Sequence, residues 1–418
     1  MKIGGTVSSI LSRPATADIQ LVFGPGADGN EDVMTAFQFA ADIWAREIVS
    51  SVPIIVMADF ADLGAGVLAS AGPLAFMQNF PNAPEQDVFY PVALANSIAG
   101  ADMAPGTADL VVNLGNGVNF FFGTDGNPPP GTFDFVTIAL HELGHGLGFV
   151  DGGNVNGAGL GDINGGGDPF IFDLFVVDGD GNSVLDLPNP SIELGDFFVS
   201  GDVFVDGEAA VEALNGVNPE LFAPNPFQGG SSIAHWDEAV FPPGDPNSLM
   251  TPAAGPAESN FNVGDITRGH FSDMGWVLAD QGPVNVIPGS ISETINTGEN
   301  LFVELLVDNL TDADINVTVT TSDGSVVIGT IDPVNFTLPV DGSTIVNLEL
   351  TAVNVAGGFF DEILTFSAEG SDLDFQVPVS VQVLDGTEAP IIGVNPDSFN
   401  VTLEHCLLYT SPSPRDRG

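Results

Sequence analysis

Basic residues are scarce in this sequence. The 418 residues include 6 Lys plus Arg against 56 Asp plus Glu, which gives a formal net charge of -50 at pH 7. A nucleic-acid duplex is held by cationic side chains that neutralise phosphates, and an anionic membrane surface attracts the same side chains. The composition therefore excludes nucleic acid and anionic membrane surfaces as expected partners. Hydrophobic residues make up 44% of the chain, enough to build folded cores despite the charge.

Cysteine is almost absent as well. The one cysteine, Cys406, begins the C-terminal segment CLLYTSPSPRD, and this segment resembles the translation of a sequencing adapter. We therefore interpret residues 405–418 as an artefactual tail. Without that tail the chain has no disulfide, no thiolate ligand for a metal and no cysteine that could block an active site.

Long apolar runs are missing too. No window reaches the roughly 18 to 20 consecutive apolar residues that a membrane-spanning helix needs, so we expect no membrane span. Residues 1–13 lack the charged start and the apolar centre of an export signal. We expect that any such signal is missing from this fragment.

Helices and buried strands alternate in the N-terminal half. Asn30 is placed to cap a helix whose apolar residues recur at helical spacing. Residues 54–57 and 110–113 are short apolar runs typical of buried strands. Asp134 is placed to cap a further helix over residues 135–146.

Residues 170–187 are predicted to form two strands joined by a turn at residues 178–182. The Asp-Gly and Gly-Asn pairs of this turn supply the positive φ angles that a tight turn needs. The alternative interpretation is a calcium site at Asp178, Asp180 and Asn182, whose spacing imitates the start of an EF-hand loop. The later positions of that loop lack the expected Gly and Glu, which favours the plain turn.

The C-terminal part has the pattern of an all-β domain. Apolar and polar residues alternate in several runs separated by Asp, Gly and Asn turns, which predicts an Ig-like β-sandwich over residues 283–387. Residues 394–403 repeat the pattern of residues 286–295, so a second, truncated sandwich is predicted at residues 388–404. The expected fold class is therefore α+β over residues 1–280, followed by an all-β sandwich.

The clearest chemical motif is HExxH, formed by His141, Glu142 and His145 within the helix predicted after Asp134. Residues four apart share one face of a helix, so both imidazoles can bind one Zn²⁺. Glu142 lies beside them and can take a proton from a water molecule on the metal. The plain alternative is an amphipathic helix with incidental histidines. Only five His occur in the whole chain and two of them fall here, which favours the zinc site.

Gly148 extends the motif to HExxHxxG, a pattern that resembles the metzincin metallopeptidases. In the simplest metzincins the third ligand follows three residues later, where this chain has Asp151. Two further stretches, His235-Trp-Asp-Glu and Leu-Met250-Thr-Pro, resemble the leishmanolysin-like branch of these enzymes in its secreted bacterial form. This resemblance implies a metzincin-like catalytic domain with His235 as the third zinc ligand, Asp151 as the alternative, and a Met-turn at Met250 beneath the metal.

Other polar residues near these motifs receive simpler interpretations. Residues 265–276 resemble the short helix after the Met-turn of that branch, and His270 within it is assigned a satisfied structural role. Asp237 and Glu238 are candidates for orienting the ring of His235, with an exposed acidic pair as the equal alternative. No Tyr follows the Met-turn before the suspect tail, so a phenolic ligand is not expected.

The motif and the resemblance together imply a zinc-dependent endopeptidase, secreted or at the cell surface, with Glu142 as general base and proteins or peptides as substrates. The alternative is a cell-surface adhesion or binding protein with a structural or inactive zinc site. A structural site needs no Glu beside its His pair, which favours the enzyme. We expect the sandwich to act as a spacer or to dock substrate or the cell surface, and the negative field to disfavour acidic substrates.

Overall fold

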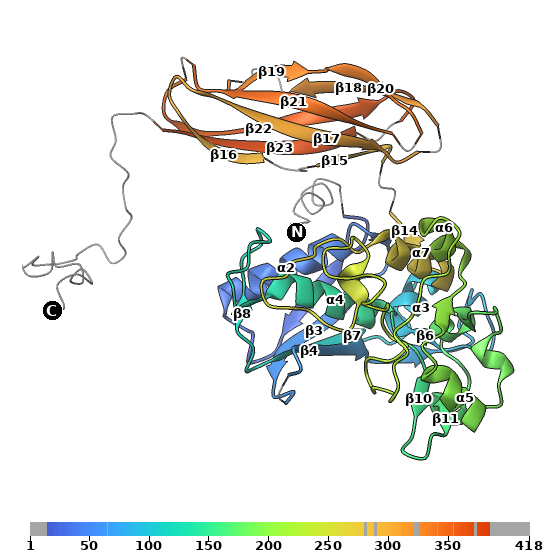
Figure 1. The fold of residues 1–418 in the computed structure, drawn as a ribbon. Helices are drawn as coiled ribbons and strands as arrows, with labels where there is room; N and C mark the ends of the chain where they lie inside the picture. Colours follow the sequence, from blue (N-terminus) through green and yellow to red (C-terminus); the bar gives the residue numbers. More distant parts are fainter. Residues whose placement is uncertain are drawn as a thin grey trace, which may run out of the picture.

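The computed structural model describes residues 15–384, apart from residues 65, 280–281, 288–290, 312, 322–325, 341, 354 and 372–373 (Figure 1). Its buried hydrophobic residues form two clusters, one from Ala17 to Trp276 and one from Val284 to Val383. Each cluster is the core of its own region. We call residues 15–279 the mixed region and residues 282–384 the sandwich region.

A four-stranded sheet in the order β1-β3-β7-β4 forms the centre of the mixed region. Its strands are β1 (Ile19–Phe23), β3 (Ile54–Ala61), β7 (Leu110–Gly115) and β4 (Ala69–Pro73). The first three run parallel to one another, whereas β4 runs antiparallel to β7 and ends the sheet. The strands predicted at residues 54–57 and 110–113 are therefore confirmed as parts of β3 and β7.

Two helices pack against this sheet and against each other. They are α2 (Glu31–Trp44), which contacts β1 and α4, and α4 (Phe135–Leu147), which contacts β4 and β7. The side chain of Asn30 accepts from the backbone N–H of Val33, and that of Asp134 from the N–H of Thr137. Both predicted caps are confirmed. The cap at Asp134 fixes where α4 begins, so the HExxH residues fall in its later turns.

The remaining elements of the mixed region are short. They are β2 (Ile48–Val49), β5 (Phe76–Met77), β6 (Tyr90–Pro91), α3 (Val92–Ala99), β8 (Phe120–Phe121), β9 (Phe133–Asp134), β10 (Gly153–Val155), β11 (Gly161–Ile163), η1 (Asn164–Gly166), η2 (Ile171–Phe175), β12 (Val176–Asp178), η3 (Val184–Asp186), α5 (Ile192–Phe198), β13 (Val203–Val205), α6 (Glu208–Ala213), η4 (Ser248–Met250), α7 (Asp265–Met274) and β14 (Val277–Leu278), where η marks a 3-10 turn. Strand β14, at the end of the mixed region, pairs with β2, which follows α2 near its start.

The prediction that residues 170–187 form two strands paired with each other is wrong. The first exists as β12, but β12 pairs with β13 further along the chain. Beyond the turn the chain forms η3, and a single bridge between Val177 and Ser183 joins the two sides. The turn residues fix a local bend, whereas tertiary packing decides which segment pairs with a strand.

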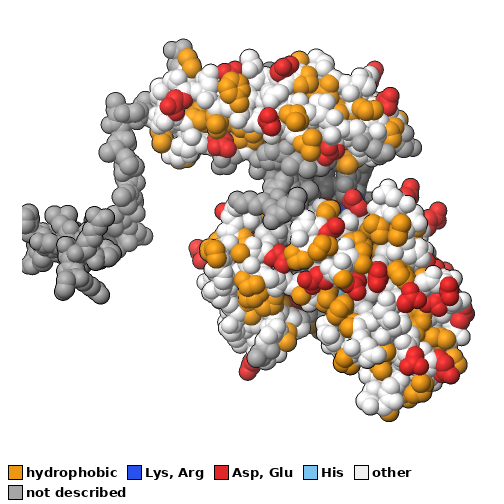
Figure 2. All heavy atoms as spheres, viewed as in Figure 1, with side chains coloured by type: hydrophobic (Ala, Val, Ile, Leu, Met, Phe, Trp, Pro, Cys, Tyr) orange, Lys and Arg blue, Asp and Glu red, His pale blue; other side chains and the backbone are white. Residues whose placement is uncertain are grey.

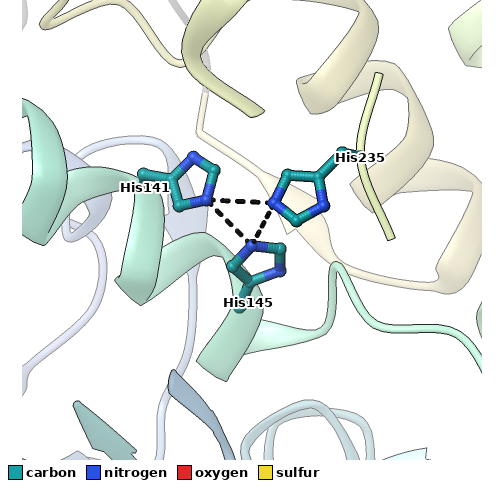
Figure 3. Close-up of side chains that lie close together, drawn as sticks. All are labelled: His141, His145 and His235. Atoms are coloured by element: carbon teal, nitrogen blue, oxygen red, sulfur yellow. Dashed lines mark hydrogen bonds between the residues drawn. The ribbon is translucent and has the colours of Figure 1, made fainter. Parts of the chain in front are cut away.

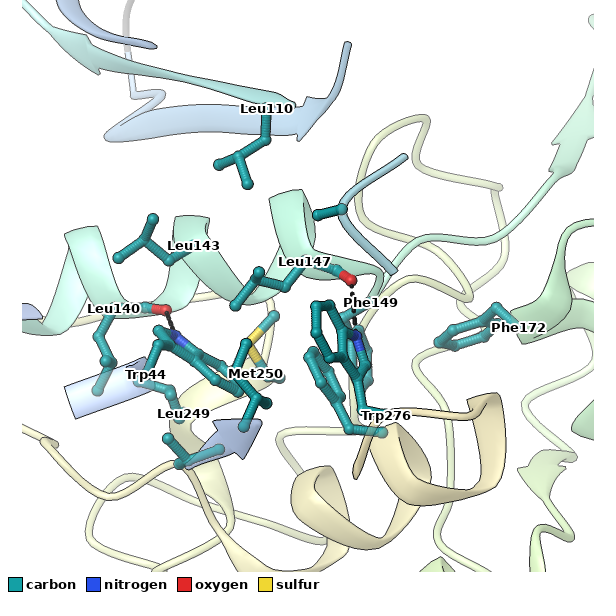
Figure 4. Close-up of a cluster of buried hydrophobic side chains, with 14 of the residues drawn as sticks. Trp44, Leu110, Leu140, Leu143, Leu147, Phe149, Phe172, Leu249, Met250 and Trp276 are labelled. Carbon is teal, nitrogen blue, oxygen red and sulfur yellow. Dashed lines mark hydrogen bonds between the residues drawn. The ribbon is translucent and has the colours of Figure 1, made fainter. Parts of the chain in front are cut away.

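Two tryptophans fix the rotation of α4 (Figure 4). The indole N–H of Trp44 donates to the carbonyl of Leu140 at 2.8 Å, and that of Trp276 donates to the carbonyl of Leu147 at 3.1 Å. Both rings are buried, so each indole needs such an acceptor. The two hydrogen bonds lie on either side of the HExxH turns and hold that part of the helix in place.

The sandwich region consists of two sheets, in the orders β15-β17-β21-β19 and β16-β23-β22-β18-β20. The strands are β15 (Val284–Ile287), β16 (Ile291–Asn296), β17 (Asn300–Asn309), β18 (Ile315–Thr321), β19 (Ile328–Asp332), β20 (Asn335–Leu338), β21 (Ser343–Thr351), β22 (Gly358–Ala368) and β23 (Asp374–Leu384). Buried and exposed residues alternate along β17 and β21, as the sequence pattern predicts. The chain thus combines helices and strands in its first region with a β-sandwich in its second.

Acidic side chains are scattered over the face shown in Figure 2. Among the described residues, Arg46 and Arg268 are the only basic ones. None of the helices in this described part has both the length and the apolar character that crossing a bilayer requires. The predicted second sandwich at residues 388–404 and the tail at 405–418 lie outside the described residues.

Candidate metal centre

Helix α4 presents two imidazoles on one face. His141 and His145 lie four residues apart, and their Nε2 atoms are 2.9 Å from each other (Figure 3). A third imidazole comes from a loop distant in sequence. The Nε2 atom of His235 lies 3.1 Å from that of His145 and 3.3 Å from that of His141. Three ring nitrogens therefore converge on one point.

A backbone carbonyl orients each of these rings through the other ring nitrogen. The three Nδ1 pairs are His141 with Leu249 at 2.7 Å, His145 with Phe149 at 2.7 Å and His235 with Ser231 at 2.8 Å. A carbonyl oxygen can only accept, so each Nδ1 carries the proton and each Nε2 keeps a lone pair. Three lone pairs that face one another repel, and a cation between them removes the repulsion. The donor set therefore fits a metal ion.

Burial keeps the three rings neutral. It is the largest cause of a lowered pKa at each of them, and it brings the pKa of His145 to about 3, with a further contribution from His141. The pKa of His235 is held well below its usual value by burial and by the two neighbouring histidines. The pKa of His141 is lowered by burial, against the raising effect of its bond to Leu249. Neutral imidazole is the form that binds a metal.

Glu142 lies next to the imidazoles in a protected position. Its side chain is 6% exposed, and burial raises its pKa to about 8. A nearby cation would oppose this effect, since it favours the charged carboxylate.

The imidazoles and Glu142 line a cleft of about 720 Å³. One wall is α4, and another is formed by residues 66–71, which include the start of β4. The rest comes mainly from residues 229–235 and 248–254. The charged residues of the lining are Glu142, Asp151 and Glu258, all of them acidic.

Asp151, the alternative third ligand, lines this cleft but does not join the three histidines. Its Oδ1 atom accepts from the backbone N–H of Gly153 at 2.6 Å. Burial and the negative charge of Asp173 raise its pKa well above the usual value. Among the described residues, the group of His, Cys, Asp or Glu able to share a metal consists of His141, His145 and His235, whose ligand atoms lie within 4.8 Å of one another.

Met250 packs against the turn of α4 between the two helix histidines. A Cβ atom added to Gly144 would lie 2.7 Å from the Sδ atom of Met250, so the absence of a side chain at Gly144 permits the close approach. The backbone here carries two further contacts, because the carbonyl of Leu249 holds His141 and the carbonyl of Met250 accepts from the N–H of Trp236 at 2.9 Å. Segment 249–250 thus connects the helix to the loop that supplies His235.

The proposed calcium residues form a turn that is closed on itself. The carboxylate of Asp178 accepts from the backbone N–H groups of Asp180 and Asn182 and from the side-chain amide of Asn182. These hydrogen bonds, those from Asn182 foremost, lower its pKa. The hydrogen bonds account for the Asp and Asn residues, in agreement with the turn interpretation, and no described residues around Asp178 form a metal-binding group.

One of the two alternatives for Asp237 and Glu238 is not observed, and the prediction of a satisfied His270 is wrong. The ring of His235 is oriented by the carbonyl of Ser231 rather than by Asp237 or Glu238; Asp237 instead accepts from the N–H of Ala239. His270 is buried as predicted but not satisfied, since neither ring nitrogen has a hydrogen-bond partner. Aromatic rings surround it at centroid distances of 4.6–5.9 Å, namely Phe149, Phe172, Phe175 and Trp236.

The sequence motifs do not reveal the groups that orient the metal ligands. The carbonyls of Phe149, Ser231 and Leu249 are backbone atoms, so no residue type marks them. The one available signal is position, because Phe149 and Ser231 each lie four residues from the histidine they orient. Strand β4, whose first residues line the cleft, also escapes prediction, since its sequence ASAGP lacks a strand pattern.

Comparisons with known proteins give no functional assignment. No protein-family profile and no curated protein matches the chain. Among solved structures, PapD-like domain 7 of human CEP192 is 15% identical, with a TM-score of 0.20, over 25% of this chain and 86% of that one. A Porphyromonas gingivalis protein of unknown function is 22% identical, with a TM-score of 0.23, over 25% and 50%. The CupB2 chaperone of Pseudomonas aeruginosa is 11% identical, with a TM-score of 0.19, over 24% and 56%.

Proposed function

We propose that this chain is a zinc-dependent endopeptidase with a metzincin-like mixed region. The observation that carries the proposal is the convergence of three neutral imidazoles that line a cleft together with the buried carboxyl group of Glu142. His141, His145 and His235 would hold the metal, and Glu142 would be the general base. The helix that carries HExxH and the buried Met250 support the resemblance to metzincins.

Zinc is the metal that this donor set fits best. Three neutral imidazoles with an open fourth position are a common zinc environment in hydrolases. Nitrogen atoms about 2.0–2.1 Å from a tetrahedral zinc ion are roughly 3.3 Å from one another. The observed separations of 2.9, 3.1 and 3.3 Å between Nε2 atoms are close to this value.

Glu142 supplies the proton transfer that peptide hydrolysis needs. A bound zinc ion would contribute Lewis acidity, which acidifies water and polarises a carbonyl group. Glu142 would take the proton of the attacking water and deliver it to the leaving amine. This role needs the carboxylate form of Glu142, which a cation held by the three histidines would favour. Its burial keeps bulk water away from the transferred proton.

The cleft offers a way to hold an extended peptide. Strand β4 is the last strand of its sheet, and its first residues line the cleft along the side that faces α4. A substrate strand can add to such an edge through backbone hydrogen bonds, which bind many sequences alike. That mode of binding favours proteins and peptides as substrates.

The test combines zinc stoichiometry with casein cleavage by the full chain. We expect one zinc ion per wild-type chain, loss of zinc in His235→Ala, and retention of zinc without cleavage in Glu142→Gln. Asp151→Ala is the matched control, because Asp151 lines the same cleft outside the three-histidine group; it should keep its zinc. Zinc without cleavage in the wild type would instead favour an adhesion or binding protein of the cell surface. Cleavage retained in Glu142→Gln would contradict the proposed base.

A further inference from the structure

A buried hydrogen bond connects α7 to the loop of His235. The indole N–H of Trp236 donates to the hydroxyl oxygen of Thr267 at 2.9 Å, and neither side chain is exposed to solvent. A buried indole N–H that loses its acceptor is unfavourable, because no water can replace the partner. Thr267 therefore determines how the ring of Trp236 is turned.

Trp236 is directly coupled through the backbone to His235, one of the three proposed metal-binding residues. It follows His235 in the chain, and backbone hydrogen bonds hold the pair on both sides. The N–H of Phe222 donates to the carbonyl of His235 at 2.8 Å, and the N–H of Trp236 donates to the carbonyl of Met250 at 2.9 Å. With the backbone held in this way, a displaced indole ring would strain the same short segment that aims His235 at the other two histidines.

The same indole contacts the support of a second ligand. Its ring lies edge-to-face with the ring of Phe149, with centroids 4.9 Å apart and an interplanar angle of 75°. The carbonyl of Phe149 is the group that accepts from Nδ1 of His145. Trp236 thus adjoins His235 in the chain, and its ring packs against the residue whose carbonyl orients His145.

We propose that Thr267 is a positioning residue of the metal centre, acting through the indole of Trp236 on the geometry of His235 and His145. This inference rests on the proposed metal centre but not on peptidase activity. Partners that hydrogen-bond directly to a metal ligand typically change metal affinity by about 10- to 100-fold. Thr267 acts one contact further out, through the indole of Trp236, so we expect an effect at or below the lower end of that range.

The experiment measures metal binding in the full chain. Thr267→Val keeps the size of the side chain and removes the acceptor. We expect its affinity for Zn²⁺, measured by competition with a chromophoric chelator, to fall by up to about 10-fold, the lower end of the range for direct partners of metal ligands. We also expect a changed visible absorption spectrum after Co²⁺ substitution, because that spectrum reports ligand geometry. Thr267→Ser restores the oxygen atom and should restore both readings.

A matched control separates positioning from general stability. Ser191→Ala removes another buried hydrogen bond of the mixed region, the one from the N–H of Leu194 at 2.9 Å, at a residue outside the cleft. It should lower the Tm and leave zinc affinity and the Co²⁺ spectrum unchanged. If Thr267→Val behaves like this control, Thr267 has only a structural role and the inference is wrong.

A second variant covers the case in which Thr267→Val does not fold. Trp236→Phe removes the donor and should weaken zinc binding and alter the Co²⁺ spectrum in the same direction. Where both single variants fold, the double variant should bind zinc no more weakly than the weaker single one, because both remove one interaction. Unchanged zinc binding in Trp236→Phe would overturn the inference. A wild-type chain that binds no zinc at all would overturn the proposed metal centre and this inference with it.

Discussion

The two regions of the molecule treat buried polar groups differently. The mixed region buries Glu142, His235, Thr267 and His270 together with several other polar side chains, whereas the described sandwich buries only Asn309 and Glu362. Both of these satisfy nearby backbone groups. Asn309 donates to the carbonyls of Ala313 and Pro339, and Glu362 accepts from the N–H groups of Val326 and Val327.

This difference shows where the chain bears the cost of buried polar groups. Burying a polar group costs free energy unless the group is hydrogen-bonded. Burying several lone pairs that point at one another costs more, because they also repel. The sandwich avoids the problem by alternating apolar and polar residues along regular strands. The mixed region bears this unfavourable free energy where the three imidazoles meet, and a bound cation would offset the repulsion between their lone pairs.

Metal removal should separate the two regions most strongly. We expect a chelator to destabilise the mixed region by about 4 kcal/mol when the free metal had been at roughly 1,000 times its Kd. The sandwich holds no ligand of the proposed site and should not respond. Hydrogen exchange followed by mass spectrometry reports both regions in one sample. Equal loss of protection in the sandwich would contradict the separation.

Acidification should destabilise the mixed region through His270. Burial lowers the pKa of His270 to about 3 in the folded protein, whereas an unfolded His titrates near 6.5. Between these values the unfolded chain binds a proton that the folded chain does not, so the free energy of unfolding falls as the pH drops, by about 1.4 kcal/mol per pH unit.

His270→Phe removes this titrating group and should flatten the pH dependence of the mixed region by that amount. Urea denaturation at several pH values measures the slope for both proteins. The described sandwich contains no His and serves as the internal reference. Identical slopes in the wild type and the variant would contradict the lowered pKa of His270 in the folded protein.

Gly144→Ala should destabilise the mixed region by about 1–3 kcal/mol, the usual range for overpacking a core. The added Cβ atom would lie 2.7 Å from Sδ of Met250 and 3.3 Å from Cζ2 of Trp44. Met250 is fully buried, so its side chain has little room to move away. The clash should therefore outweigh the roughly 1 kcal/mol that Ala normally gains over Gly in a helix. Gly358→Ala in the sandwich is the control, because its nearest atom, in Phe360, would be 3.7 Å away. Thermal denaturation should show a lower Tm for Gly144→Ala alone.

Phe302→Ser should have the smallest effect. Phe302 projects from β17 of the sandwich with 68% of its surface exposed, so little buried contact is lost. We expect a change in the free energy of unfolding within about 0.5 kcal/mol, measured by urea denaturation. A larger loss would mean that this exposed ring has a partner in solution, and the comparison between the regions would then have to include an interface.

Local signals in the sequence predict much of this structure. The caps at Asn30 and Asp134 are chosen by residues within one turn of the helix start, so a short window suffices. The spacing of His141 and His145 follows from the helix itself. The nearness of His235 to this pair came from a resemblance, because no local rule connects residues 90 or more positions apart.

The failures involve groups whose surroundings are assembled from distant segments. The environment of His270 comes from Phe149, Phe172, Phe175 and Trp236, which no window around His270 contains. Strand β4 forms because β7 offers it a partner, although its own residues are small and include a proline. Tertiary context overrides propensity in both cases.

One pairing in the sandwich has a mechanical consequence. Strand β16, near the start of the region, runs parallel to β23, its last strand, with partners from Ile291 with Val379 to Asn296 with Leu384. The chain therefore enters β16 and leaves β23 at opposite ends of the shared ladder. A pull along the chain loads these hydrogen bonds in shear, so that they must yield together rather than open one by one.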